Sequence, residues 1–263
     1  MSKVTIGNYE VIKQIGEGGC ARTYLARHVF LGEPACLKQN LEITKEEEEA
    51  LLKEARVLWH IHHYSLPTLR DYIKCDDGSF VLVMSFIKGK DLYKIIEEDF
   101  PEGIDPEHVC WMTQRLLNAL HYLHFHGIIH GDVKPQNIIV KPEDHNAVLV
   151  DYGLATVRPR SRTPSPGCTP AFAAPEQLAG MPPIPETDLY GLGTTMIFAL
   201  GGNIVGKIFP SHVHPLIKEF FDRLVLHDPM KRPKTASELI KPLSDIREKV
   251  FGRRTSSKEL KIS

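Results

Sequence analysis

The sequence is poor in cysteine and carries no excess of charge of either sign. Its five cysteines are scattered over 263 residues and never stand as a C-x-x-C pair, which argues against a disulfide framework or a zinc site and favours a reducing compartment. Its 32 basic and 33 acidic residues give a formal net charge of −1, so no overall basic field favours nucleic acid or an anionic membrane. We therefore expect neither of them as a partner.

An apolar leader and a long unbroken apolar run are also missing. Residues 1–9 are polar and lack the apolar core of a signal peptide. The most apolar stretch, residues 189–208, is interrupted by glycines and an asparagine, which indicates a buried helix followed by a loop rather than a membrane span. These features favour a cytoplasmic protein.

The first third of the chain contains short apolar segments separated by glycine and proline. A helix interrupts them, because Thr44 and Glu47 form a capping box and Leu51 and Leu58 share one helical face. The expected strands cover residues 9–15, 23–28, 35–39, 69–74 and 79–86.

Helical periodicity dominates the remainder of the chain. Asp105 is a good N-cap for a long helix, Pro106 suits its first position and Gly127 ends it. Strands followed by helices predict an α+β fold, with a small antiparallel β-sheet lobe carrying one helix and a larger, mainly helical lobe. Further helices are expected at residues 187–200, 215–226 and 235–246, and the basic, Ser-rich residues after them are expected to form a flexible tail.

Two features of the first lobe are compatible with phosphate binding. Gly16 and Gly18 lie between two expected strands and would let the backbone fold over phosphates, although a G-x-G pair is more often a hairpin turn. Lys38 ends the third strand, and Glu54 lies on the apolar side of the following helix, where an acid needs a buried cation. A glutamate at the helix edge is an equally good interpretation of Glu54.

The segment HGDVKPQN carries the densest chemistry in the chain. The Asp132 carboxylate can orient a hydroxyl and accept its proton, and the Lys134 ammonium can neutralise charge on a transferring phosphoryl group. The amide oxygen of Asn137 is a hard ligand suited to Mg²⁺. Asp151 follows an apolar run and precedes Tyr152-Gly153, which makes it a reasonable second metal ligand.

These motifs together resemble the eukaryotic-type protein kinase family. That family combines a Gly-rich loop, V-A-I-K, H-R-D-L-x-x-x-N, D-F-G and A-P-E, and this chain gives IGEGGCARTY, ACLK, HGDVKPQN, DYG and APE in the same order. The resemblance extends from about Tyr9 to Ile246. It implies the bilobal protein-kinase fold, with an N-lobe at residues 1–84, a hinge at 85–87, a C-lobe at 88–247 that includes an activation segment at 151–176, and a tail at 248–263.

The resemblance also implies a role for each motif residue. Asp132 would be the catalytic base, Lys134 would contact the γ-phosphate, and Asn137 and Asp151 would coordinate Mg²⁺. Lys38 would hold the α- and β-phosphates of ATP while pairing with Glu54. The remaining nucleotide contacts would come from Gly16, Gly18 and Thr23 of the Gly-rich loop, Cys36 and Ile139 around the purine, the gatekeeper Met84, the hinge residues Ser85–Ile87 and, at the ribose, Asp91.

The C-lobe motifs are those of a serine/threonine kinase. Lys134 is followed by proline, and Thr169 matches the threonine that braces the base in such kinases. Glu176 and Arg232 match a buried ion pair that anchors the activation segment, and Asp188 matches the aspartate that holds the catalytic loop.

Several positions depart from the family pattern. Ala21 replaces the third glycine, and Cys36 replaces an alanine and would be a possible thiol-reactive spot. Gly131 replaces the arginine that normally receives an activation-loop phosphate, so we expect basal activity without phosphorylation of Thr163 or Ser165. The short connection at residues 201–214 predicts that a substrate-docking helix is reduced or missing.

The expected function is ATP- and Mg²⁺-dependent phosphorylation of Ser and Thr hydroxyls in proteins, including the chain itself. Two alternatives remain open. The first is a catalytically weak pseudokinase that acts as a scaffold, and the second is a small-molecule kinase of the aminoglycoside or choline type, which also resembles H-G-D-x-x-x-x-N. Substrate, regulators and oligomeric state are not encoded in these motifs.

Overall fold

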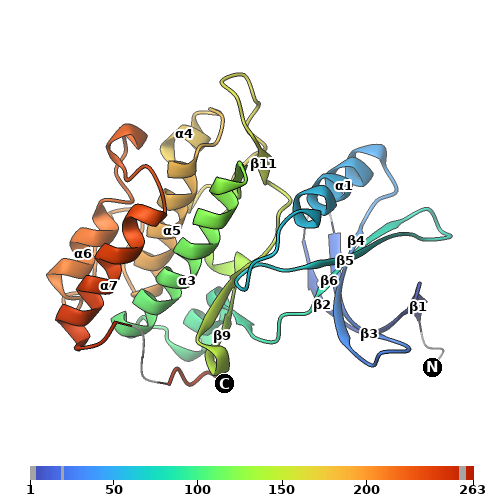
Figure 1. The fold of residues 1–263 in the computed structure, drawn as a ribbon, viewed down its shortest axis with the longest axis horizontal. Coiled ribbons are helices and arrows are strands. Elements are labelled where there is room, and N and C mark those ends of the chain that lie inside the picture. The colour runs from blue at the N-terminus through green and yellow to red at the C-terminus, as the bar shows by residue number, and fades with distance from the viewer. Residues whose placement is uncertain (1–3, 19–20, 255–258) are drawn as a thin grey trace. The chain divides into compact units, whose positions relative to one another are not determined.

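The computed structural model describes residues 4–18, 21–254 and 259–263. The chain divides into two compact units, Met1–Lys88 and Gly89–Ser263, and each is described by itself. The first unit contains all strands of one large sheet and a single helix, whereas the second is mainly helical (Figure 1). The α+β prediction is therefore confirmed.

The first unit is a six-stranded antiparallel sheet in the order β1-β2-β3-β4-β6-β5. Helix α1 (Lys45–Trp59) follows β4 and begins as expected, because the Thr44 hydroxyl accepts from the amide of Glu47 at 3.3 Å. The strands are β1 (Thr5–Ile6), β2 (Tyr9–Glu17), β3 (Ala21–His28), β4 (Pro34–Asn40), β5 (Leu69–Lys74) and β6 (Phe80–Ser85). The sequence pattern missed only β1 among them, since two residues carry no periodicity.

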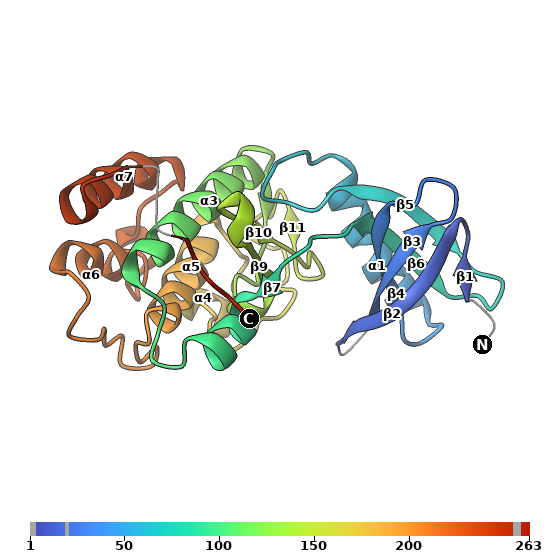
Figure 2. The same ribbon diagram turned by 90° about the horizontal axis from the view of Figure 1, so that it is seen from below.

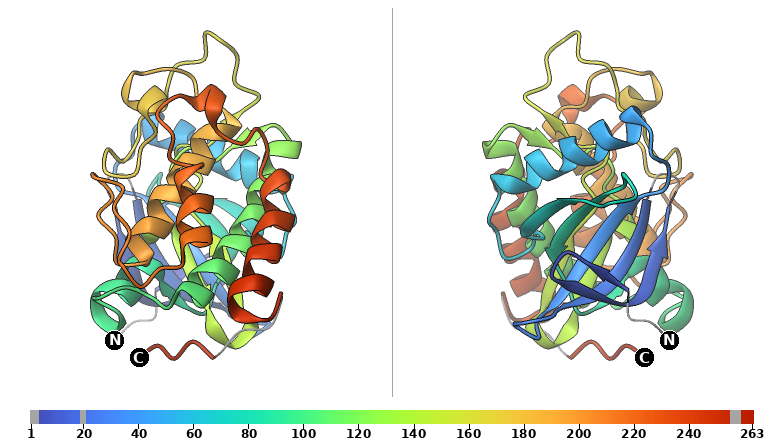
Figure 3. Two further views of the ribbon diagram at one scale, coloured as in Figure 1. Left: turned by 90° about the vertical axis from the view of Figure 1, so that its left-hand side faces the viewer. Right: turned by 90° about the vertical axis from the view of Figure 1, so that its right-hand side faces the viewer.

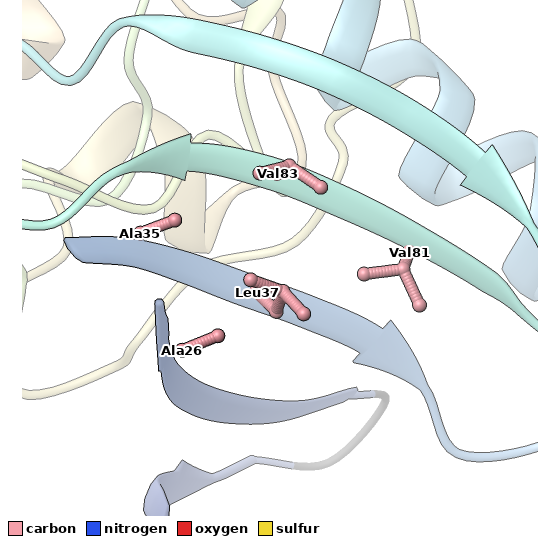
Figure 4. Packing of buried hydrophobic residues seen from close by; sticks show 5 residues of the cluster. All are labelled: Ala26, Ala35, Leu37, Val81 and Val83. Atoms are coloured by element: carbon pink, nitrogen blue, oxygen red, sulfur yellow. The ribbon is translucent and has the colours of Figure 1, made fainter. Parts of the chain in front are cut away.

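One face of this sheet carries a tightly buried apolar cluster. It consists of Ala26 from β3, Ala35 and Leu37 from β4, and Val81 and Val83 from β6, each at most 3% exposed (Figure 4). Because side chains alternate along a strand, the residues between them point to the opposite face. That opposite face therefore receives Cys36, Lys38 and Met84.

The second unit is built on a core of packed helices. Helix α3 contacts both α5 and α7, and all three lie side by side in Figures 1 and 2. The left view of Figure 3 shows α7 in front of α3 along the outer side of the unit. The helices are α2 (Leu92–Lys94), the π-helical turn η1 (Ile95–Asp99), α3 (Pro106–Phe125), α4 (Pro175–Leu178), α5 (Pro185–Ala199), α6 (Pro215–Asp222) and α7 (Ser237–Phe251).

Small strands carry the polar motifs of this unit. Three of them form a sheet in the order β10-β9-β7, and two others pair as β11-β8. Short 3₁₀ turns at Pro135–Asn137 and Pro142–Asp144 lie between these strands, and a third at Pro229–Lys231 lies between α6 and α7. The strands are β7 (Lys90–Asp91), β8 (Ile128–Ile129), β9 (Ile138–Lys141), β10 (Asn146–Leu149) and β11 (Thr156–Val157).

The chain crosses itself closely where residue 103 meets residue 201. Gly103 has φ of +102° and Gly201 has φ of +79°, a region that favours glycine. A Cβ on Gly103 would lie 2.4 Å from the Leu200 carbonyl oxygen, and one on Gly201 would lie 2.3 Å from that of Glu102. The amide of Ile104 donates to Ala199 at 2.7 Å, so the two backbones are locked at this crossing.

The prediction of a flexible tail at residues 248–263 is wrong for the described part of that segment. Helix α7 continues to Phe251 and ends at Gly252, whose φ is +72°. Beyond the helix, Arg253 pairs with Glu107, and Leu260 is only 3% exposed. The basic composition of this segment predicted an exposed tail. The acidic residues that it contacts, Glu107 and Asp99, lie far from it in the sequence and were not recognised as its partners.

The shortened connection between α5 and α6 forms no helix over residues 200–214, all of which are described. Instead, Asn203 and Ile208 pair through two backbone hydrogen bonds of 2.9 and 3.0 Å and close a tight turn. The sequence predicted that a helix in this connection would be reduced or missing, and the described residues 200–214 contain none. Among the described residues, no helix is both long and apolar enough to cross a membrane.

Candidate active site

The loop that carries Asp132 is anchored by the buried carboxylate of Asp188. Asp188 on α5 is 1% exposed, and it accepts the amide of His130 at 2.9 Å and that of Gly131 at 2.8 Å. Nε2 of His124, near the end of α3, lies 2.8 Å from the same carboxylate. Gly131 has φ of +77°, where glycine avoids the strain of a side chain. These contacts fix the loop backbone before the reactive side chains are placed.

Three side chains meet around the carboxylate of Asp132. The hydroxyl of Thr169 donates to Oδ1 at 2.7 Å, and the ammonium of Lys134 lies 2.6 Å from Oδ2. Lys134 also donates to the Thr169 hydroxyl at 2.8 Å, and Nδ2 of Asn137 donates to Oδ2 at 3.0 Å. The carboxylate is therefore held in one orientation and flanked by a cation.

Asp151 lies next to this cluster, at the end of β10. The amide of its neighbour Val150 donates to the backbone oxygen of Asn137 at 2.9 Å, which ties the two segments together. Asp151 has φ of +67°, a region that aspartate adopts more readily than most residues. This backbone turns the chain away from the strand immediately after the apolar run ends.

The donor set of this cluster fits Mg²⁺. Both side-chain hydrogen bonds of Asn137 use the amide nitrogen, which leaves the amide oxygen for a cation, and Asp151 adds a carboxylate. Mg²⁺ usually takes only one or two protein oxygens and completes its shell with water and phosphate. A site of three or more His, Cys, Asp or Glu ligands, as zinc would need, does not occur among the described residues.

The first unit holds a separate ion pair. Nζ of Lys38 on β4 lies 2.7 Å from Oε2 of Glu54 on α1, and the Glu54 side chain is 3% exposed. Thr23 pairs with Lys38 in the register of β3 and β4, so both side chains leave the same face of the sheet. Of the two interpretations that the sequence left open for Glu54, the structure shows the buried ion pair.

The glycines at the β2–β3 connection are not required by the fold. A Cβ on Gly16 would lie 3.8 Å from Thr23, and one on Gly18 would lie 4.0 Å from the oxygen of Ala21, both ordinary contacts. Neither glycine has a positive φ. The absence of side chains at Gly16 and Gly18 would therefore let a ligand approach the backbone closely.

A sequence model of the protein kinase domain matches residues 9–260. The chain belongs to the protein kinase domain family. It is 33% identical over 220 residues to serine/threonine-protein kinase D of Synechocystis, covering 76% of this chain and 42% of that protein. It is 29% identical over 275 residues to serine/threonine-protein kinase PknA of Nostoc, covering 92% and 48%. A mouse relative, sperm motility kinase 2B, is 28% identical over 254 residues, covering 89% and 51%.

The kinase domain spans about half the length of the curated relatives it matches. The match confirms the predicted eukaryotic-type Ser/Thr kinase family and the bilobal α+β kinase fold. One unit is mainly β-sheet and the other mainly helical, in agreement with that fold.

The expected nucleotide contacts of the kinase domain fall in both units. Cys36 and Met84 pair in the register of β4 and β6, and the amide of Ser85 donates to Thr68 at 2.8 Å, which leaves it engaged within the unit. In the second unit, Asp91 and Ile139 pair between β7 and β9. Ile87 lies just after β6, in the last residues of the first unit.

Burial changes the expectation for Cys36. Burial raises the pKa of its thiol to about 11, more than the neighbouring Lys38 lowers it, so the reactive thiolate is scarce at neutral pH. The prediction that Cys36 is a thiol-reactive spot is therefore not supported by its surroundings.

A buried ion pair joins Glu176, in the first turn of α4, to Arg232. Arg232 grips Glu176 with two hydrogen bonds of 2.7 and 2.9 Å, and Thr187 donates to the same carboxylate at 2.9 Å. Burial raises the pKa of Glu176, but the hydrogen bonds and the charge of Arg232 together lower it further, so the net shift is downward. The carboxylate therefore stays ionised at neutral pH.

Three residues that support the loop carrying Asp132 were missed by sequence reasoning. Gln177 follows the APE motif and donates to the oxygen of Gly131 at 2.8 Å, and Thr195 on α5 donates to the oxygen of Val133 at 3.3 Å. His124 was missed as well. Gln177 and Thr195 are polar residues at buried helical positions and His124 is a half-buried one, which is the signal that could have found them.

Proposed function

We propose that the kinase domain transfers the γ-phosphate of ATP, with Mg²⁺, to Ser and Thr hydroxyls of proteins and also of itself. The observation that carries the proposal is the cluster around Asp132, in which Thr169, Lys134 and Asn137 all bond one carboxylate within 3.0 Å. A carboxylate oriented in this way has the geometry that a general base needs.

The side chains divide the work of the reaction. Asp132 holds the substrate hydroxyl and accepts its proton as the oxygen bonds to the γ-phosphorus and the β–γ bridging bond of ATP breaks, releasing ADP. Lys134 offsets the charge that develops on the phosphoryl oxygens. Asn137 and Asp151 would hold Mg²⁺, which when bound neutralises phosphate charge. In the first unit, Lys38 would hold the nucleotide phosphates while Glu54 keeps its ammonium in place.

Two further observations support a protein substrate and a cytoplasmic location. Thr169 bridges Asp132 and Lys134, as the serine/threonine pattern requires, and several relatives are named serine/threonine-protein kinases. The cysteines in the described part of the chain carry free thiols, which suits a reducing compartment.

The test is phosphate transfer by the purified chain, measured with radiolabelled ATP and by mass spectrometry of the modified residues. Wild type with Mg²⁺ should modify Ser or Thr, and EDTA should stop the reaction. Asp132→Asn should lower the rate by several powers of ten while nucleotide binding, followed by thermal shift, remains. Asp245→Asn, which changes a half-buried carboxylate of α7 that pairs with Arg254, is the matched control and should behave as wild type.

Three results would count against the proposal. Nucleotide binding without any transfer would favour a scaffold. Phosphate found on a small alcohol such as choline or an aminoglycoside, and not on protein, would favour a small-molecule kinase. Activity of Asp132→Asn close to that of wild type would remove Asp132 from the chemistry.

A further inference from the structure

The last described segment of the chain, residues 259–263, is tied to the beginning of the second unit. The amide of Ser263 donates to Oδ1 of Asp99 at 3.1 Å, and the ammonium of Lys90 donates to the Ser263 hydroxyl at 3.2 Å. That hydroxyl in turn donates to Asp99. Figure 2 shows the C-terminal end beside β7, in agreement with these contacts.

An apolar anchor and an ion pair fasten the same end of the chain. Leu260 is 3% exposed although Glu259 and Lys261 on either side of it are exposed. Arg253 donates to both oxygens of Glu107 at 2.5 and 2.7 Å, and the Glu107 side chain is 3% exposed. Ordering a segment without regular secondary structure costs conformational entropy, so three separate contacts indicate a segment that docks specifically.

Lys90 connects this segment to strand β7, because its ammonium bonds both Ser263 and Asp99. Its side chain is 16% exposed, and its ammonium lies 2.7 Å from both Glu98 and Asp99. Lys90 and Asp91 make up β7, where Asp91 pairs with Ile139 of β9. The Asp91 carboxylate caps α2: it accepts the amide of Lys94 at 2.9 Å and lies 3.1 Å from the Lys94 ammonium. Because adjacent side chains on a strand point to opposite faces, the contacts of Lys90 hold the backbone of β7 from which the Asp91 side chain extends on the other face.

We propose that Arg253 and residues 259–263 form an intramolecular strap, and that Lys90, held by Asp99 and Ser263, is a positioning residue that aims Asp91 at the ribose of the nucleotide. The docking of the strap stands on the contacts above, whereas its effect on nucleotide rests on the proposed function. Loosening the strap lowers affinity for ATP at a distance, without a change in any residue that touches the nucleotide.

The experiment compares Leu260→Asp, Ser263→Ala and Lys90→Met with the control Lys261→Ala, which alters an exposed residue of the same segment. Hydrogen–deuterium exchange reports on peptides that cover residues 90–99. Calorimetry gives the Kd for Mg-ATP and for Mg-2′,3′-dideoxy-ATP, which lacks the ribose hydroxyls. In Leu260→Asp and Lys90→Met, the amides of residues 90–99 should exchange faster than in wild type. Both variants should also bind ATP about tenfold more weakly, which is the loss expected of one hydrogen bond to a charged group.

The dideoxy nucleotide separates positioning from general damage. Its affinity should not change in the variants, because Asp91 has no ribose hydroxyl to meet. Exchange at residues 90–99 equal to wild type in both Leu260→Asp and Ser263→Ala would overturn the strap. Equal losses for both nucleotides, or no loss, would overturn the role of Lys90. A wild-type chain that binds neither nucleotide would overturn the proposed function and the effect on ATP, while the exchange data still decide whether the strap docks.

Discussion

Removing the cation of the buried Glu176–Arg232 pair should destabilise the second unit severely. Arg232 is 2% exposed, and beyond its two bonds to Glu176 it donates to three main-chain oxygens, those of Leu226, Glu186 and His227. In Arg232→Met all of these acceptors lose a donor and a buried carboxylate loses its counter-ion. Breaking a buried pair in this way costs about 3–5 kcal/mol.

That loss is large against the total stability of a domain, about 5–15 kcal/mol. At roughly 2–4 °C per kcal/mol for a domain of this size, the melting temperature should fall by about 6–20 °C. Differential scanning fluorimetry measures it. The control is Lys234→Ala, two residues away, whose ion pair with Glu186 at 3.1 Å is half exposed and should contribute at most about 1 kcal/mol. A shift in Arg232→Met no larger than that of the control would refute the reasoning.

The pH dependence gives this prediction a second readout. Since the pKa of Glu176 is lowered in the folded state, the pair contributes fully above the ordinary glutamate pKa of about 4.3 and its contribution is lost as the pH falls through the folded value. The difference in stability between wild type and Arg232→Met should therefore narrow below about pH 4. A difference that stays constant down to acid unfolding would contradict the ionic origin of the effect.

Three further outcomes are expected. Gly16→Ala should melt within about 1 °C of wild type, because its Cβ meets only Thr23 at 3.8 Å, yet bind Mg-ATP more weakly in calorimetry; a normal Kd would contradict a close approach of phosphate. Thr169→Val removes the hydroxyl between Asp132 and Lys134 and should lower kcat about 10- to 100-fold with little change in the KM for ATP, as steady-state kinetics would show. Cys36 should react with iodoacetamide at pH 8 about 100-fold more slowly than an ordinary thiol, because a pKa of about 11 leaves little thiolate. Mass spectrometry of the labelled peptides measures this rate, and rapid labelling would count against the burial of Cys36.

Local patterns predicted the elements whose determinants lie within a few residues of one another. The N-cap at Thr44 and the Asp105–Pro106 start are examples, and both helices begin where these residues predict, although the Glu47 side chain of the expected capping box accepts the amide of Glu42 instead of that of Thr44. The ends of helices were less predictable. The helix expected to reach residue 226 ends at Asp222, and α7 passes Pro242 and runs on to Phe251, because packing against α3 rather than propensity decides how far α7 extends.

The motif residues of the candidate site were found because their spacing is local, but what supports them is not. Asp132 and Asn137 lie five residues apart, whereas Gln177 contacts Gly131 from 46 residues away. The docked end of the chain was missed for the same reason. Ser263 meets Asp99 across 164 positions, and composition alone cannot distinguish a basic residue in solvent from one that pairs with a distant acid.

The crossing at Gly103 and Gly201 has a consequence for how this chain can vary. Each glycine packs against the backbone of the other segment. A Cβ would lie 2.4 Å from a carbonyl oxygen at Gly103 and 2.3 Å from one at Gly201. Neither position can accept alanine while the other backbone stays in place, and restoring space at one does not relieve the positive φ at the other. Substitutions in this part of the molecule are thus constrained by main-chain geometry rather than by side-chain chemistry, and both sites should stay free of side chains in variants selected only for folding.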